Sequence, residues 1–376
     1  MPEARGTVIH SARLVDGGAV HADAWVRFER EHVAAVGTGD SWRSAGHQHS
    51  DDTIVDASGH WLTPGFVDIH GHGGGGVSYD DGAEQILTAR ALHRAHGTTR
   101  AVISLVTAPL DALATRVALI AELCAAHPDI LGSHLEGPFL DPGHKGAHDA
   151  SQLREPDEAA VALLIEAASG TLCQVTIAPE LPGGMAAVAQ LRAAGVVPAI
   201  GHTDADFGGA QAAINAGAGL LTHAFNAMRG LHHRDPGPVA AATHDPRLVL
   251  EIIADGVHVH PEVVRMVFAA APGRVALVTD AMAAAGASDG HYDLGSLGVD
   301  VVDGVARLSD GGAIAGSTLT QDAALRWCVE TVGIDVASAV TAVTETPARA
   351  VGRGDDLGRL VPGFAADAVL LDDALR

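Results

Sequence analysis

The sequence predicts an α/β protein: a (β/α)8 TIM-type barrel with a small β-sandwich domain built from both chain ends. Two observations lead to this prediction. Between about residue 62 and residue 350, eight short apolar runs rich in β-branched residues alternate with longer Ala-rich runs. Polar side chains follow several of the short runs, which is where barrels of this kind carry their functional groups.

The expected barrel elements alternate regularly along the chain. The strand candidates are "WLTPGFVDIH", "TRAVISLV", "ILGSHLE", "LCQVTIAPE", "VVPAIGH", "GLLTHAF", "LVLEIIADG" and "VALVTDA". The helix candidates include "AEQILTARALHRAHG", "DALATRVALIAELCAAH", "PDEAAVALLIEAASG" and "PEVVRMVFAAA", with a last pair near 318–332 and 335–350. Eight such strand and helix units suit a (β/α)8 barrel.

Both chain ends are expected to lie outside the barrel. Residues 1–61 contain short strand-like runs separated by Gly and Asp turns, and residues 351–376 contain one more. We expect these two segments to form the small β-domain together, beside a barrel of residues 62–350. The Gly, Ser, Asp and His cluster at 37–53 is expected to be an exposed loop, and residues 285–296 a mobile loop near the active-site mouth.

Composition restricts the partners and the compartment. The chain has 376 residues, of which 47% are hydrophobic, and a formal net charge of -23. Nucleic-acid binding needs clustered cations, so no nucleic-acid partner is expected. Neither a basic leader nor a long uncharged apolar run is present, so we expect no membrane contact and a cytoplasmic location. Cys124, Cys173 and Cys328 lie far apart in apolar segments and are expected to be buried, reduced thiols.

The segment "PGFVDIHGHGGGG", residues 64–76, has two interpretations. Its glycines spell G-x-G-x-x-G, the dinucleotide-binding fingerprint, but the next helix begins near residue 82 and the next strand ends "SLVTAP", without the required carboxylate. His70 and His72 spell H-x-H, and side chains two apart on an extended segment point the same way and can hold one cation. We therefore favour a metal site, with the later glycines in a flexible turn.

Further strand ends supply ligands of the same kind. Glu136 ends the third run, His202 the fifth and His223 lies in "THAFNAM" at the sixth. Imidazole and carboxylate groups are ligands that zinc and iron take. Asp280, at the end of the eighth run, supplies a carboxylate that could act on a bound water.

Taken together, these blocks resemble the amidohydrolase superfamily and, within it, the N-acetylglucosamine-6-phosphate deacetylase family. The resemblance runs nearly end to end and rests on "PGFVDIHGHGG", "HLEGPFLDPGHKGAH", "VTIAPE", "GHTDA", "THAFNAM", "IIADGVHV", "LVTDAM", "IAGSTLT" and "PGFAADAVLL". Dihydroorotase-like relatives bridge two metals with a carboxylated lysine at the end of the fourth strand. This chain's only lysine, Lys145, lies after the third strand, and Glu136 matches the carboxylate that such deacetylases use as a ligand.

The resemblance implies a metal-dependent enzyme that hydrolyses the acetamide of N-acetylglucosamine 6-phosphate to glucosamine 6-phosphate and acetate. It implies that Glu136, His202 and His223 hold one divalent metal ion. Because His70 and His72 are also present, we predict a second position, so that one or two ions (Zn, Fe, Mn or Co) bind per subunit.

Catalytic and substrate contacts are likewise implied by the resemblance. Asp280 is expected to take a proton from the attacking water and pass it to the departing amine, while His148 stabilises the carbonyl oxygen. Arg234 is expected to bind the phosphate in the active site of a neighbouring subunit, which implies a homodimer. The other expected substrate contacts are Ala147, Asn226, Ala227, His258, Ile314, Ala315 and Gly316.

Other substrates and a non-catalytic function are also compatible with these residues. The same chemistry on N-acetylgalactosamine 6-phosphate differs by one hydroxyl group, and another amidohydrolase reaction on a small amide is less favoured. A metal-stabilised sugar-phosphate-binding protein without chemistry would not require the carboxylate of Asp280. Glu180, in "APE", has no derivable role in the site, and we assign it a structural one.

Overall fold

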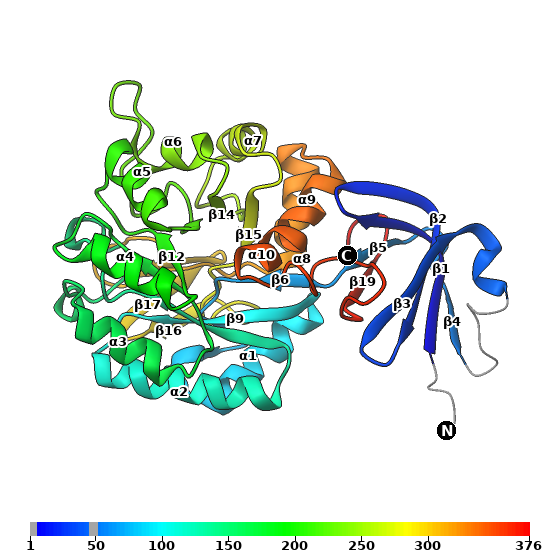
Figure 1. Ribbon diagram of the computed structural model, residues 1–376, viewed down its shortest axis with the longest axis horizontal. Helices are drawn as coiled ribbons and strands as arrows, with labels where there is room; N and C mark the ends of the chain where they lie inside the picture. Colours follow the sequence, from blue (N-terminus) through cyan, green and yellow to red (C-terminus); the bar gives the residue numbers. More distant parts are fainter. Residues whose placement is uncertain (1–5, 45–51) are drawn as a thin grey trace.

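The computed structural model describes residues 6–44 and 52–376 and consists of a barrel and a smaller β-domain (Figure 1). Figure 1 places the barrel with its outer helices at one end of the molecule and the strands of the small domain at the other. The predicted fold class is confirmed, because an eight-stranded parallel sheet forms the barrel and strands from both chain ends pair outside it.

The barrel sheet runs in the order β15-β14-β13-β12-β11-β10-β9-β6, and each neighbouring pair is parallel. The strand residues are almost all buried, as expected for strands covered on both faces. The strands are β6 (Phe66–Asp68), β9 (Thr98–Val106), β10 (Ile130–Glu136), β11 (Leu172–Ile177), β12 (Val197–Ile200), β13 (Leu220–Leu221), β14 (Val249–Ile253) and β15 (Val275–Val278).

Residues just past the first and last strands join the two ends of this sheet. The N–H of Asp280 donates to the carbonyl of His70 at 2.8 Å. The Thr279 hydroxyl donates to the buried carboxylate of Asp68 at 2.6 Å. The segment that follows β6, which carries H-x-H, therefore lies beside the segment that follows β15.

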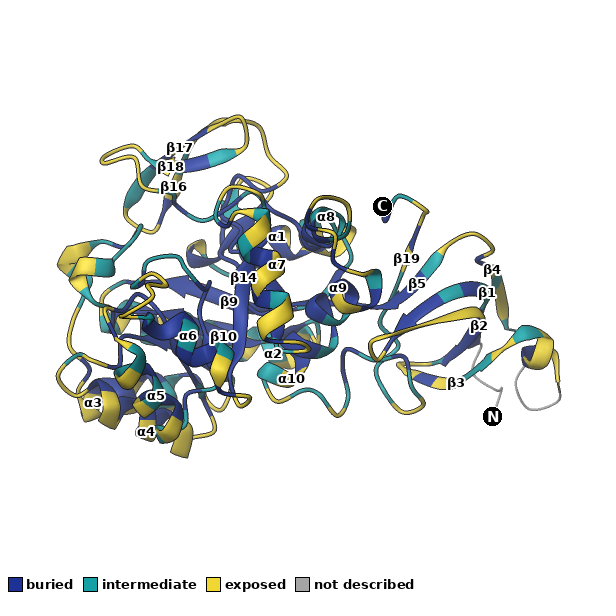
Figure 2. Cartoon of the chain, turned by 90° about the horizontal axis from the view of Figure 1, so that it is seen from above, coloured by how far each residue is buried: buried dark blue, intermediate teal, exposed yellow. Residues whose placement is uncertain are grey.

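Helices surround the strands, and buried and exposed residues alternate along them (Figure 2). In α2 the buried residues Leu113, Val117 and Ile120 recur at helical spacing. Asp157 and Asp206 cap the helices that follow them, each accepting from a backbone N–H three residues on. The helices are α1 (Ala83–Ala95), α2 (Leu110–Ala126), α3 (Glu158–Ala167), α4 (Gly184–Ala193), α5 (Phe207–Ala216), α6 (Gly237–His244), α7 (Pro261–Ala270), α8 (Gln321–Trp327), α9 (Val336–Val343) and α10 (Glu345–Ala350).

The helix predicted over 335–350 is divided into α9 and α10. Thr344 takes φ -129° and ψ -85°, outside the helical region, and Pro347 has no N–H to continue the helical bonding. The helix predicted near 318–332 begins at Gln321 and ends in a wider, π-helical turn, Cys328–Val332. Within the described ranges, no helix is long and apolar enough to cross a membrane.

The first predicted barrel strand is divided between the two domains. β5 (Trp61–Pro64) pairs with β1 and β19 of the small domain, whereas β6 pairs with β9 in the barrel. Gly65 lies between them, and a Cβ there would lie 2.2 Å from the Thr99 Oγ1. The chain therefore changes sheets at a position where only glycine fits without displacement of its neighbours.

The small domain is a six-stranded sheet in which β1 pairs with β2 on one side and with β4 and β5 on the other. Near the chain end, the Arg359 guanidinium donates to the buried Asp16 carboxylate at 3.0 Å. Of the loop predicted at 37–53, residues 39–43 form a short 3-10 helix and residues 45–51 lie outside the described residues. The strands are β1 (Gly6–Asp16), β2 (Ala19–Glu29), β3 (His32–Thr38), β4 (Thr53–Asp56), β5 (Trp61–Pro64) and β19 (Ala368–Leu371).

The prediction of a loop over 285–296 is wrong for residues 290–294, which form a strand. Residues 290–308 form a three-stranded antiparallel sheet of β16 (Gly290–Leu294), β17 (Leu297–Val302) and β18 (Val305–Leu308), here called the cover sheet (Figure 2). Along β17, Val299 and Val301 are buried whereas Asp300 and Val302 are exposed, an alternation that is typical of strands.

The glycine run after H-x-H forms a hairpin. β7 (Gly73–Gly74) pairs with β8 (Val77–Ser78), and the turn between them has φ 65° at Gly75 and 87° at Gly76, the region that favours glycine. Because α1 begins only at Ala83, these glycines do not lead into a helix N-terminus that could bind a pyrophosphate. The dinucleotide interpretation is therefore excluded.

Candidate active site

The C-terminal ends of the barrel strands surround a cavity of about 250 Å³. Side chains from both the strand ends and the cover sheet line it, including the apolar side chains of Val106 and Leu294. Most of the residues that the sequence singles out meet at this cavity. They are His72, Glu136, Ala147, His148, His202, His223, Asn226, Ala227, His258, Asp280, Ile314 and Gly316.

Three predicted site residues lie elsewhere. His70 is fully buried behind the cavity wall, next to His72. Ala315 packs into the apolar cluster beneath the cover sheet. Arg234 is exposed on the loop that precedes α6 and is not among the residues that line the cavity.

Glu136, the last residue of β10, lies at the centre of the imidazoles. Its Oε1 lies 3.0 Å from Nε2 of His202 and 2.9 Å from Nε2 of His223. These two nitrogens are 3.1 Å apart. Its Oε2 lies 3.1 Å from Nε2 of His72 and 3.4 Å from Nε2 of His148. One carboxylate is thus shared by two groups of imidazoles.

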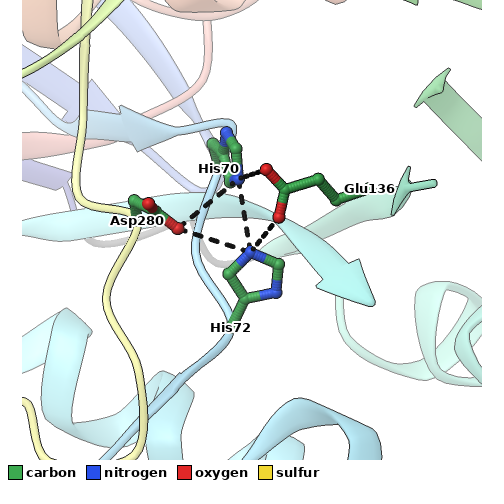
Figure 3. Close-up of side chains that lie close together, drawn as sticks. All are labelled: His70, His72, Glu136 and Asp280. Carbon is green, nitrogen blue, oxygen red and sulfur yellow. Dashed lines mark hydrogen bonds and ion pairs between the residues drawn. The ribbon is translucent and has the colours of Figure 1, made fainter. Parts of the chain in front are cut away.

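We call His202 and His223 the first group beside Glu136, and His70, His72 and Asp280 the second group (Figure 3). In the second group, the two histidine Nε2 atoms are 3.3 Å apart. The Oδ1 of Asp280 lies 3.4 Å from Nε2 of His72 and 3.6 Å from Nε2 of His70. All four side chains are buried, so their charges interact with little screening by solvent.

Burial and the surrounding charges act in opposite directions on these groups. Burial alone would raise the pKa of Glu136, but the charge of His70 and the imidazoles beside the carboxylate hold that pKa well below its usual range. Burial would also raise the pKa of Asp280, but His70 and His72 hold it below its usual range. Burial would lower the pKa of His72, yet Asp280 and Glu136 raise it to about 9. Both acids are therefore carboxylates at neutral pH.

Three of the site residues have a strained backbone. His202, His223 and Asp280 have φ of 47°, 26° and 47°, in the left-handed region that costs non-glycine residues on the order of 1–3 kcal/mol. Each lies within two residues of the end of a barrel strand. Such conformations persist only where the surroundings hold them, and they cluster at functional sites.

The arrangement around His202 fits a divalent metal ion. Its Nδ1 donates to the carbonyl of His144 at 2.8 Å, and burial lowers its pKa to about 4, so the ring is neutral. Its Nε2 therefore presents a lone pair to the Glu136 Oε1, which is itself only an acceptor. A cation that both atoms coordinate removes this repulsion, and nitrogen and oxygen donors of this kind suit zinc or iron.

The sequence did not point to two further carboxylates next to site histidines, the buried Glu251 and the partly buried Asp255. Glu251, inside β14, accepts from Nδ1 of His70 at 2.9 Å. Asp255 accepts from Nδ1 of His258 at 2.6 Å and from its backbone N–H at 2.9 Å. Glu251 had a recognisable signal, because an acidic residue in the middle of a strand buried on both faces needs a specific partner.

Glu180 is bonded outside the cavity. Its carboxylate accepts from the Thr203 hydroxyl at 2.5 Å and from the Asp204 N–H at 2.6 Å. These bonds hold the loop that carries His202, in agreement with the structural role assigned from the sequence.

A parallel barrel with carboxylate and imidazole groups gathered at the C-terminal ends of its strands is characteristic of metal-dependent hydrolases. The sequence profile of the Amidohydrolase family matches residues 61–375, and the chain belongs to that family.

Its relatives include named sugar-phosphate deacetylases. The N-acetylgalactosamine-6-phosphate deacetylase of Escherichia coli O157:H7 is 40% identical over 328 residues, which cover 86% of this chain and 87% of the relative. The N-acetylglucosamine-6-phosphate deacetylase of Vibrio furnissii is 37% identical over 314 residues, covering 82% and 78%. A mutant N-acetyl-D-glucosamine-6-phosphate deacetylase of Mycobacterium smegmatis, solved in complex with N-acetyl-D-glucosamine-6-phosphate, superposes with a TM-score of 0.92 at 40% identity, covering 99% and 96%.

Proposed function

We propose that this chain hydrolyses the acetamide of N-acetylglucosamine 6-phosphate and releases acetate and glucosamine 6-phosphate. The observation that carries the proposal is the buried cluster around Glu136 with the carboxylate of Asp280 beside it, at the wall of one cavity. The substrate follows from the similarity to a deacetylase that was solved with this sugar phosphate, which extends over 99% of the chain.

In the proposed site, Glu136, His202 and His223 would hold one divalent ion. His70 and His72 would hold a second ion, with Glu136 between the two positions. Zn, Fe, Mn and Co all accept ligands of these kinds. When bound, such an ion supplies Lewis acidity toward the amide carbonyl and toward the attacking water.

Asp280 would transfer the proton. Its Oδ1 accepts a proton from water as the water oxygen bonds to the acetyl carbon. The proton then passes to the amide nitrogen as the C–N bond breaks, which leaves acetic acid and an amine. The second proton of the water leaves the acetic acid, so the products at neutral pH are acetate and the protonated amine. The Nε2 of His148, on the cavity wall, would donate to the carbonyl oxygen as that oxygen gains negative charge.

The sugar phosphate would lie against Asn226, Ala227 and His258, which line the cavity. We propose that Arg234 of a second copy in a homodimer binds the phosphate, because a guanidinium donates two parallel hydrogen bonds to phosphate oxygens. The free thiols found among the described residues suit a cytoplasmic enzyme.

A second candidate substrate is N-acetylgalactosamine 6-phosphate, because a relative of that name is 40% identical over 86% of this chain. The two sugars differ only in the configuration of one hydroxyl group. Both candidates share the proposed chemistry at the acetamide.

Acetate release by the purified protein tests the proposal. The substrates are the two epimeric sugar phosphates and unphosphorylated N-acetylglucosamine, each before and after chelation. Fast, chelator-sensitive release from N-acetylglucosamine 6-phosphate is expected. Faster release from the galactosamine epimer would favour the second candidate, and no release from any of the three would refute the proposed function.

A further inference from the structure

Glu251 is a fully buried carboxylate in the middle of β14, with 0% of its surface exposed. Its neighbours in the strand are the apolar residues Leu250 and Ile252, and β14 lies between β13 and β15 within the barrel sheet. Removing a carboxylate from water is unfavourable unless hydrogen bonds compensate for the lost hydration. Its contacts therefore indicate what this residue does.

Each oxygen of Glu251 accepts a hydrogen bond. Oε2 accepts from the backbone N–H of His223 at 3.2 Å and lies 2.9 Å from Nδ1 of His70. Oε1 accepts from the side-chain amide of Gln174 at 3.4 Å, and the same amide donates to the carbonyl of Ile69 at 2.9 Å. Because both oxygens already act as acceptors, the proton between Oε2 and Nδ1 belongs to His70.

This contact determines which ring nitrogen of His70 has a lone pair available for a metal ion. With Nδ1 protonated and held by Glu251, the lone pair of a neutral ring is on Nε2. That atom lies 3.3 Å from Nε2 of His72 and 3.5 Å from Oε1 of Glu136. In contrast, Nδ1 of His72 has no hydrogen-bond partner among the described residues. His70 is thus the member of the H-x-H pair whose Nδ1 is held by a buried carboxylate.

We propose that Glu251 is a positioning residue that holds His70 in the Nδ1–H form and thereby prepares Nε2 to bind the second metal ion. The inference rests on the proposed metal-dependent function. A ligand histidine that donates its other N–H to a carboxylate is oriented and made more basic, and loss of such a partner costs metal affinity. Glu251 also bonds to the backbone of His223, so it contacts one residue from each group around Glu136.

Metal titration of two variants tests the proposal. Zn²⁺ is titrated into metal-free protein in competition with a chromogenic chelator, for wild type, Glu251→Gln and Glu251→Leu. Wild type is expected to bind two equivalents. Glu251→Leu removes the acceptor and should weaken the second equivalent by about 100-fold, whereas Glu251→Gln keeps a neutral acceptor and should weaken it by about tenfold. The first equivalent should change much less.

A matched control separates this effect from general destabilisation. Asp245 is also a buried carboxylate, 7% exposed, and it bonds Gln211 and Arg247 before β14 begins, at the end of the barrel away from the cavity. Asp245→Asn should lower the melting temperature but keep both Zn²⁺ equivalents.

Histidine NMR of the metal-free protein gives a readout that does not depend on activity. In protein labelled with ¹⁵N-histidine, the His70 signal, assigned with His70→Asn, should show a proton on Nδ1. Glu251→Leu, which has no acceptor, should lose this preference, whereas Glu251→Gln should keep it. Three outcomes would overturn the inference: one Zn²⁺ equivalent in wild type, wild-type affinity for the second equivalent in Glu251→Gln, or equal weakening of both equivalents. A wild type that shows the expected titration but releases no acetate would refute only the proposed reaction.

Discussion

Glu136 connects the two groups of imidazoles at the scale of single residues. Its Oε1 contacts His202 and His223, and its Oε2 contacts His72 and His148. A carboxylate with this many imidazole neighbours stays ionised although it is buried, because they hold its pKa low. Among the described residues, Glu136 is the member common to both clusters of candidate metal-ligating groups.

Asp280→Asn is predicted to remove most of the activity and to leave the metal content unchanged. The amide has nearly the shape of the carboxylate but cannot accept a proton from water, so kcat should fall by about 10²- to 10⁴-fold. Acetate release and metal analysis measure the two effects. The exposed Asp310→Asn is the control, with wild-type turnover expected. Near-normal turnover of Asp280→Asn would contradict the role of its carboxylate.

The cysteines are predicted to react slowly with thiol reagents in the folded protein. Burial raises the pKa of Cys124 to about 11 and the pKa of Cys173 and Cys328 to about 12. Only the thiolate reacts, so labelling should be slow at pH 7–8 and accelerate as the pH rises toward these values. Cys124 and Cys173 are only partly buried, and Cys124 has the lower pKa of the two, so it should react first. Immediate labelling of all three thiols at pH 7, without denaturant, would show that this protection is absent.

At the scale of elements, the strand ends matter more than the strand lengths. β13 has only two residues, yet His223 follows it within two residues and reaches Glu136. The register between β10 and β9 places Glu136 opposite Val106, so a carboxylate and an apolar side chain lie side by side at the cavity wall. The regular barrel thus delivers side chains from distant parts of the chain to one place.

Gly65→Ala is predicted to destabilise the junction between β5 and β6. Its Cβ would lie 2.2 Å from Oγ1 and 2.7 Å from Cγ2 of Thr99, so rotation of that branched side chain cannot relieve the contact. The free energy of unfolding should fall by about 1–3 kcal/mol in chemical denaturation. Gly230→Ala, with nothing within 4 Å of the added atom, should change it by much less. Equal stability of the two variants would contradict the close approach at Gly65.

At the scale of the whole molecule, the position of Arg234 provides a test of the proposed homodimer. It is exposed on the loop before α6 and does not line the cavity of its own chain. Arg234→Ala is predicted to raise KM for the phosphorylated substrate with less effect on the unphosphorylated sugar. This is the pattern expected when a phosphate contact is lost.

A mixed dimer distinguishes an arginine that acts across the interface from one that acts in its own subunit. Co-expression of Arg234→Ala and Asp280→Asn chains with different tags allows the heterodimer to be purified. If Arg234 acts across the interface, one site keeps both Asp280 and a partner arginine, and about half the wild-type activity should return with the wild-type KM. If the KM stays raised, or no dimer forms, the proposed arrangement is incorrect.

Much of the architecture follows from local patterns. The alternation of apolar runs predicted all eight barrel strands in order, because burial on both faces leaves a continuous apolar run in the sequence. It did not predict that the first run is shared between two sheets at Gly65 or that residues 290–308 pair with one another. Which strands pair depends on how segments that are distant in the sequence meet in space. The hydrophobic periodicity within one segment carries no information about its partner strand.

The same distinction holds for the site. The sequence by itself determined which imidazole and carboxylate groups end the strands, because ligand chemistry is a property of the residue type. Only the tertiary structure decided that Glu251 meets His70, 181 residues away, that Glu136 is shared by both groups of imidazoles, and that Arg234 stays outside its own cavity. These outcomes depend on the closure of the barrel. Closure brings together chain segments that are far apart in the sequence, and no local sequence pattern predicts the distances between them.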